Sequence, residues 1–345
     1  MSSTKLSTLD DECSERAAWE VDNPLTLIGG NRPYHVMSVL LAEHSHSRGI
    51  LGFLTYEDAN SLRSVCKELR DEVAGFRWKD MSTRINGRLD LWRICFTRAV
   101  SANLSERFDL TDSDFVHLRG IRHLDVSGEY VGRSMGFSDA SFVHLHGIES
   151  LDIKHCRQLT DAAFAHLEGV HTLNMSNCRQ ATITDAAFVH LKGIHTLVMS
   201  DCDQDTITDA AFAHFKGIHT LDMSWCRQET ITDAAFLHLK GIHTLDMWNC
   251  NQASITDAAF VHLKGIHTLN MFRCNQPTIT DAAFVHLRGI HTLNMEQCNQ
   301  PTITDAAFVH LKGIHTLNMG GCKQLTDNAF VHLEGIHTLL LLTLI

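Results

Sequence analysis

Apolar and polar positions repeat along this chain with a fixed period over its last two-thirds. One phenylalanine marks each of ten copies, and the most regular copies follow one another every 24 residues. Such a period predicts a solenoid, in which each unit buries its apolar face only against its neighbours. The marker residues are Phe115, Phe142, Phe164, Phe188, Phe212, Phe236, Phe260, Phe284, Phe308 and Phe330.

Each copy contains a short stretch in which apolar and polar positions alternate. In the copy over 194–202, Leu197 and Met199 alternate with Val198 and Ser200. This is the period of a strand with one buried face. We therefore expect one short strand in each copy.

A helix is predicted after each strand and turn. Thr208 or Asp209 can accept a hydrogen bond from the free N–H groups at the helix start. Phe212 and Phe215, three residues apart, are expected to point inward, and Gly217 is expected to end the helix in a left-handed conformation. One strand, one turn and one helix per copy predict an α/β fold, a curved parallel sheet with short helices on the convex side.

Upstream of the repeats, the pattern predicts a small helical region. Residues 34–42 are compatible with a short helix after Pro33. A clearer helix follows Thr55, which forms a capping box with Asp58, and Gly75 is the expected end. Its apolar positions form a single predicted stripe, made of Ala59, Leu62, Val65, Cys66, Leu69 and Val73.

The repeat resembles the cysteine-containing class of leucine-rich repeat. That class has Leu-x-x-Leu-x-Leu-x-x-Cys followed by Leu/Ile-Thr-Asp, and this chain has Leu173-Asn-Met175, then Cys178, then Ile183-Thr-Asp185. The resemblance covers about two-thirds of the chain. It implies a leucine-rich-repeat arc that uses its surface to bind other molecules.

The upstream helix resembles the F-box. The family core is Ile-x-x-Phe-Leu, then Asp, then Leu-x-x-Val-Cys-Lys, and this chain has Ile50-Leu-Gly-Phe-Leu54, Asp58 and Leu62-Arg-Ser-Val-Cys-Lys67. The resemblance implies binding to a Skp-type adaptor of a cullin–RING ubiquitin ligase. The Leu-Pro element that usually precedes this core is missing from 43–49, so the alternative is a helical cap on the first repeat. The implied adaptor-binding residues are Ile50, Phe53, Leu54, Leu62, Val65, Cys66 and Leu69.

These patterns divide the chain into four predicted parts. Residues 1–30 are expected to be disordered or loop-like, and residues 31–80 form the F-box-like helical module. Residues 81–109 link it to the repeats or cap them. Residues 110–345 form the leucine-rich-repeat solenoid, with about ten repeats.

The composition limits which binding partners and which cellular compartment are expected for this chain. A net charge of −11, from 29 basic and 40 acidic side chains, argues against nucleic acid as a ligand. No stretch approaches the roughly 20 apolar residues that span a bilayer, and the polar, acidic opening segment does not resemble a signal peptide. Eleven cysteines without an export signal predict reduced thiols in the cytoplasm or nucleus.

Cysteines and histidines recur as columns, which raises the question of metal binding. Parallel thiols on stacked turns cannot converge tetrahedrally on zinc, so we expect buried structural cysteines without a bound metal. The lesser alternative is a metal-buffering protein that uses the histidine columns. No phosphate loop or nucleophile elbow occurs, so neither cofactor nor catalysis is predicted. The cysteines are Cys156, Cys178, Cys202, Cys226, Cys250, Cys274, Cys298 and Cys322.

Two positions after the strand vary between copies. By alternation the first, occupied by Ser176, Ser200 and Ser224 in three copies, projects from the concave side, and the second begins the turn at the rim. Aromatic residues and arginine are typical interface anchors; the alternative is drift after duplication. The predicted target-binding residues are Trp225, Trp248, Phe272, Arg273 and Glu296.

The leading prediction is therefore a substrate-recognition subunit of a Skp–cullin–F-box type ubiquitin ligase that binds a target protein on the concave face. The alternative is a leucine-rich-repeat scaffold without a ligase role. Neither role requires the chain to carry out catalysis.

Overall fold

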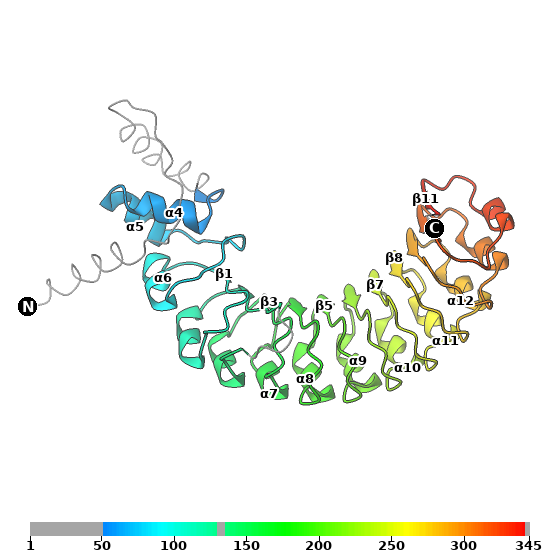
Figure 1. Ribbon diagram of the computed structural model, residues 1–345, viewed down its shortest axis with the longest axis horizontal. Helices are drawn as coiled ribbons and strands as arrows, with labels where there is room; N and C mark the ends of the chain where they lie inside the picture. Colours follow the sequence, from blue (N-terminus) through cyan, green and yellow to red (C-terminus); the bar gives the residue numbers. More distant parts are fainter. Residues whose placement is uncertain (1–50, 130–134, 342–345) are drawn as a thin grey trace, which may run out of the picture.

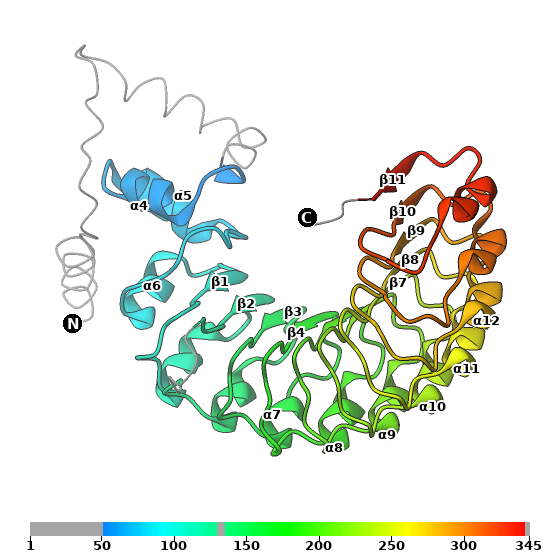
Figure 2. The same cartoon turned by 45° about the vertical axis from the view of Figure 1, so that its right-hand side comes forward.

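The computed structural model describes residues 51–129 and 135–341. They form an arc in which the strands line the inner side and the repeat helices lie outside (Figures 1 and 2). The strands make one 11-stranded sheet whose spatial order follows the chain, and all neighbouring pairs are parallel. The predicted α/β leucine-rich-repeat solenoid is confirmed.

Each phenylalanine unit supplies one strand of three residues, and these are β2 to β11. The first strand, β1, comes from the segment 81–109, which has no phenylalanine unit. The bounds are β1 Ser101–Asn103, β2 His123–Asp125, β3 Ser150–Asp152, β4 Thr172–Asn174, β5 Thr196–Val198, β6 Thr220–Asp222, β7 Thr244–Asp246, β8 Thr268–Asn270, β9 Thr292–Asn294, β10 Thr316–Asn318 and β11 Thr338–Leu340.

The six most regular helices are single α-turns, most of them continued by a 3-10 turn. They are α7 Asp161–Phe164, α8 Asp185–Phe188, α9 Asp209–Phe212, α10 Asp233–Phe236, α11 Asp257–Phe260 and α12 Asp281–Phe284. The 3-10 segments are η1 Asp112–Leu118, η2 Asp139–His144, η3 Val189–Leu191, η4 Ala213–Phe215, η5 Leu237–Leu239, η6 Val261–Leu263, η7 Val285–Leu287, η8 Asp305–Leu311 and η9 Asp327–His332. Gly217, with φ +86°, follows η4 in the predicted left-handed conformation. None of the described helices is long and apolar enough to cross a bilayer.

The Thr-Asp pair at each helix start has two separate roles. Thr232 caps its own helix, because its hydroxyl accepts a hydrogen bond from Ala234 N at 3.1 Å. Asp233 instead accepts from the next repeat, at 2.7 Å from Thr256 N and 2.6 Å from Thr256 Oγ1. The same two bonds recur between repeats from Asp139–Thr160 to Asp305–Thr326. Neighbouring helices are therefore tied together as firmly as neighbouring strands.

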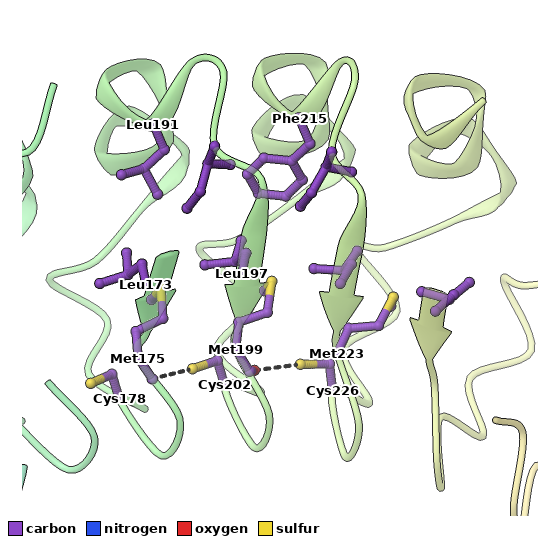
Figure 3. Packing of buried hydrophobic residues seen from close by; sticks show 14 of the residues in the cluster. Leu173, Met175, Cys178, Leu191, Leu197, Met199, Cys202, Phe215, Met223 and Cys226 are labelled. Atoms are coloured by element: carbon purple, nitrogen blue, oxygen red, sulfur yellow. Dashed lines mark hydrogen bonds between the residues drawn. The ribbon is translucent and has the colours of Figure 1, made fainter. Parts of the chain in front are cut away.

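The core is a continuous apolar row between sheet and helices, shown in Figure 3 for three repeats. The Cys202 thiol donates to Met175 O at 3.1 Å, and the Cys226 thiol to Met199 O at 3.2 Å. Burial raises the pKa of both thiols well above the ordinary range, so they stay neutral. The predicted structural role of the cysteine column is confirmed.

The N-terminal helices are α4 Tyr56–Arg63, α5 Lys67–Gly75 and α6 Leu89–Cys95. The predicted capping box is confirmed, because Asp58 N donates to Thr55 Oγ1 and Thr55 N donates to Asp58 Oδ2. Helix α5 ends at Gly75, as predicted. The helix predicted over 34–42 and the loop predicted over 1–30 lie outside the described residues.

The prediction of one continuous apolar stripe after Thr55 is wrong. The chain leaves the helix at Ser64, whose hydroxyl donates back to Ser61 O, and Cys66 is extended with φ −157°. The two residues at this break therefore leave the inward-facing stripe. Leu69 is buried, whereas Val65 and Cys66 are exposed.

An aromatic cluster joins these helices to the solenoid. The Tyr56 ring lies 4.7 Å from Phe96 and 5.8 Å from Trp92, measured between ring centroids. Its hydroxyl donates to Ser101 O in β1 at 2.6 Å. Burial raises the Tyr56 pKa, so this hydroxyl remains a donor. The helical module thus covers the first strand of the sheet.

The aspartate contact between repeats leads to a stability prediction. Asp233→Ala removes the carboxylate that accepts two hydrogen bonds. The N–H and the hydroxyl of Thr256 then lose their acceptor. We expect the free energy of unfolding to fall by about 1–3 kcal/mol, measured by urea unfolding followed by circular dichroism. Asp205→Ala, at an exposed loop aspartate, is the matched control and should change it little. Equal effects of the two variants would contradict the coupling role.

Candidate functional site

The inner face of the arc presents three side chains per repeat. In β7, Leu245 is buried and points into the core, as does Met247 just beyond the strand. The alternating positions Thr244, Asp246 and Trp248 are half-buried and face the concave side. The concave placement predicted for the first variable position is therefore consistent with the strand geometry.

Three of the predicted target-binding side chains form one row, here called the aromatic ladder, which consists of Trp225, Trp248 and Phe272. Trp225 meets Trp248 edge-on, with ring centroids 5.6 Å apart, and Trp248 stacks on Phe272 at 5.4 Å. Arginines cover both ends: the Arg227 guanidinium lies 4.3 Å from the Trp225 centroid, and that of Arg273 lies 4.9 Å from the Phe272 centroid. The ladder spans three repeats as one aromatic surface.

The second variable position has a left-handed backbone in repeat after repeat. Trp225 has φ 61° and Arg273 has φ 57°, whereas the corresponding position in the last of these repeats is Gly321. A side chain there costs about 1 kcal/mol or more relative to glycine. The bond from Trp225 N to Trp248 O, at 2.7 Å, holds this conformation. A bulky residue at this rim position is therefore not required by the fold.

A polar column that the sequence patterns did not reveal lies between the two buried positions of most strands. Asp246 Oδ1 accepts from Trp248 N at 2.9 Å, and its Oδ2 accepts from Asn270 Nδ2 at 2.8 Å. Burial, with a contribution from the Asp222 charge, raises the pKa of Asp246. The available signal was the recurrence of residues that strands disfavour. The column contains Asn103, Asp125, Asp152, Asn174, Asp222, Asp246, Asn270, Asn294 and Asn318.

Glu296 lies one repeat beyond Phe272 and is half-buried. Its carboxylate accepts a hydrogen bond from Asn318 Nδ2 at 2.8 Å, on the side away from the ladder. It therefore extends the polar column rather than the aromatic surface.

The histidines that open the strands form a continuous stack at the edge of the concave face. Ring centroids of neighbours are 4.3–4.6 Å apart, and the planes are within 13° of parallel. Each Nδ1 lies near the hydroxyl of the following threonine, for example His243 and Thr244 at 3.1 Å. Loss of water, followed by the charges of neighbouring histidines, lowers the pKa of His195 and of His315.

Parallel rings cannot direct their nitrogens at one point, as a metal ion requires. Within 51–129 and 135–341, no group of three or more histidine, cysteine or acidic side chains is arranged to hold a metal ion. The histidine stack is therefore a surface feature of the repeats.

The implied adaptor-binding residues are divided between surface and core. Phe53 is 90% exposed and Val65 is 46% exposed, and Cys66 is also exposed. Leu54 and Leu62 pack partly buried against the apolar core, and Leu69 is buried. Ile50 lies outside the described residues. The outward-facing part of this set is therefore small.

No family model and no curated protein matches this chain. Solved structures share its fold. A chain of the Drosophila Toll–Spatzle complex has a TM-score of 0.55 and 14% identity, covering 77% of this chain and 35% of that one. A chain of the TLR13–ssRNA13 complex has a TM-score of 0.53 and 15% identity, covering 74% and 45%. A chain of the yeast Rad7–Elc1 complex has a TM-score of 0.40 and 16% identity, covering 90% and 87%.

This chain thus spans less than half the length of the Toll and TLR13 chains that it matches. At these identities the likeness shows the leucine-rich-repeat fold alone.

The histidine stack predicts acid sensitivity. Because the folded pKa values of His195 and His315 lie below the unfolded value near 6.5, the unfolded chain binds more protons. Their stabilising contribution is complete above about pH 6.5 and declines as pH falls toward the folded pKa. We expect a lower melting temperature at about pH 5.5 than at about pH 7.5, measured by scanning calorimetry.

Two matched double variants distinguish the effect of histidine stacking from the effect of the number of histidines. His219→Gln with His291→Gln removes one charged neighbour of His195 and one of His315, and should flatten the acid dependence. His238→Gln with His262→Gln changes the same number of histidines on the helix side and should leave that dependence steep. Identical pH profiles for the two double variants would contradict the role of stacking.

Proposed function

We propose that this chain is a non-catalytic protein-interaction scaffold that binds a partner protein on its concave face, with the aromatic ladder as the anchor. The main support for this proposal is the continuous contact of Trp225, Trp248 and Phe272 on adjacent repeats. Aromatic side chains in contact with arginine are the composition that dominates binding energy at protein interfaces.

The main alternative is that the ladder only stabilises the repeats. Two observations favour binding. Ser176 and Ser224 occupy the position of Trp248 in other repeats with the same backbone, so the framework does not need an aromatic ring there. Trp225 occupies a left-handed position that favours glycine or asparagine. Both features are costly or neutral for folding and favourable for contact with a partner.

A second candidate is a more specific scaffold role. In it, the chain is a substrate-recognition subunit of a cullin–RING ubiquitin ligase in the cytoplasm or nucleus. Phe53 and Val65, within the F-box-like segment, expose large apolar side chains on the helical module that covers β1. In this arrangement the concave face would hold the target, and these side chains would meet a Skp-type adaptor. The competing role for the helices is capping of the sheet alone.

Removing one ladder ring tests the scaffold proposal. We expect Trp248→Ala or Phe272→Ala to weaken target capture at least tenfold, because each truncation of an interface anchor costs about 2 kcal/mol or more. The measurement is quantitative proximity labelling in cells that express the full chain. Both rings are only half-buried, so the melting temperature should change little.

Ser200→Ala is the control, since it alters the same column two repeats before Trp248 without touching a ring. Its labelled partners should match those of the wild type. Unchanged capture by both aromatic variants would overturn the proposal.

The ligase candidate has its own test. Val65→Asp places a carboxylate in the proposed apolar contact, and we expect it to abolish co-purification of a Skp-type adaptor with the full chain. Phe53→Asp should have the same effect. Val261→Asp, on the convex side and 49% exposed against 46% for Val65, should leave adaptor binding intact. If the wild-type chain retains no adaptor, the helices act as a cap.

A further inference from the structure

Two carboxylates stand side by side on the concave face next to the aromatic ladder. Asp222 in β6 pairs in register with Asp246 in β7. In-register neighbours on adjacent strands are about 5 Å apart, and like charges at this position destabilise a sheet. Burial and the Asp222 charge both raise the pKa of Asp246. The pair therefore gains from any cation placed beside it.

The sheet contains a second pair of the same kind, which is followed closely by a lysine. Asp125 in β2 pairs in register with Asp152 in β3. Lys154 follows Asp152 by two residues, and its backbone N–H donates to Asp152 Oδ1 at 2.9 Å. Burial raises the pKa of Asp152, and the positive charge of Lys154 opposes that rise. The residue two positions after Asp246 is Trp248. The middle ring of the ladder thus occupies the repeat position that Lys154 occupies after the other pair.

The arginines nearest in sequence are directed elsewhere. Arg227 lies over Trp225, and Arg273 lies over Phe272 while its Nε donates to Gln297 Oε1 at 2.7 Å. Neither contributes to the electrostatic environment that sets the pKa of Asp246. Among the described residues, no lysine or arginine forms an ion pair with Asp222 or Asp246.

We propose that the surface formed by Asp222, Asp246 and Trp248 binds a lysine or arginine side chain in a basic segment of the partner protein. The inference rests on the proposed scaffold function and specifies the partner's chemistry. The partner's cation lies beside the two in-register carboxylates, and its aliphatic stem packs along the ring of Trp248. The net charge of −11 favours approach of such a segment.

A library of random dodecapeptides displayed on phage, selected on the immobilised full chain and counter-selected on Trp248→Ala, tests this directly. We expect enrichment of lysine or arginine next to an apolar residue. Fluorescence anisotropy with an enriched peptide should show at least tenfold weaker binding to the Asp222→Asn, Asp246→Asn double variant. Added salt should weaken wild-type binding, because these charges are partly exposed.

Two further variants separate binding from folding. Asp125→Asn with Asp152→Asn removes the pair that has its own lysine and should bind the peptide like the wild type. Trp248→Lys recreates in β7 the arrangement of β3, so it should lose the basic peptide without a lower melting temperature. Because both aspartate double variants relieve like-charge repulsion, neither is expected to unfold the sheet.

The outcomes distinguish this inference from the proposed function. Enriched peptides that depend on Trp248 but lack basic residues would overturn the inference and leave the scaffold proposal intact. Full binding by the Asp222→Asn, Asp246→Asn variant would do the same. No enrichment over the Trp248→Ala surface would overturn both.

Discussion

In the repeats from Asp161 to Asp305, the aspartate at the helix start accepts two hydrogen bonds from the threonine of the following repeat, and the remaining architecture depends on this contact. It fixes the spacing of neighbouring helices, as strand pairing fixes the spacing of strands on the other side of the core. A layer of phenylalanine, leucine, methionine and cysteine can then stay continuous along the arc (Figure 3). Because both faces of the core are tied, each repeat takes nearly the same backbone whatever its variable side chains are.

That constant backbone is what makes the variable positions informative. The rim position is left-handed with Asn177, Asp201, Trp225 or Arg273 in it, so the side chain there does not determine the fold. The concave position accepts serine, tryptophan, phenylalanine or glutamate on equivalent backbone. Side chains at such positions can therefore differ between repeats without changing the fold. The ladder and the neighbouring carboxylate pair therefore form one surface with both apolar and electrostatic character.

In the helical module, one local break in the helix changes which side chains are available for binding. The residues of the F-box-like stripe lie on two helices, and the turn at Ser64 sends Val65 and Cys66 outward while Leu69 packs inward. At the same time Tyr56 fastens the module to β1. The module thus covers the end of the sheet and still exposes Phe53 and Val65, so capping and adaptor binding are compatible.

Sequence by itself determined the repeat, its strand and helix, the threonine cap, the left-handed glycine and the ring positions at 225, 248 and 272, because these follow from local patterns copied many times. Three features could not be predicted this way. Strand β1 has no phenylalanine unit, the stripe after Thr55 breaks at Ser64, and Asp233 bonds the next repeat instead of its own helix. The pairing of Asp222 with Asp246 likewise needs the register of two strands 24 residues apart. Only tertiary structure decides such contacts, because stacking of the backbone brings together residues that no local pattern connects.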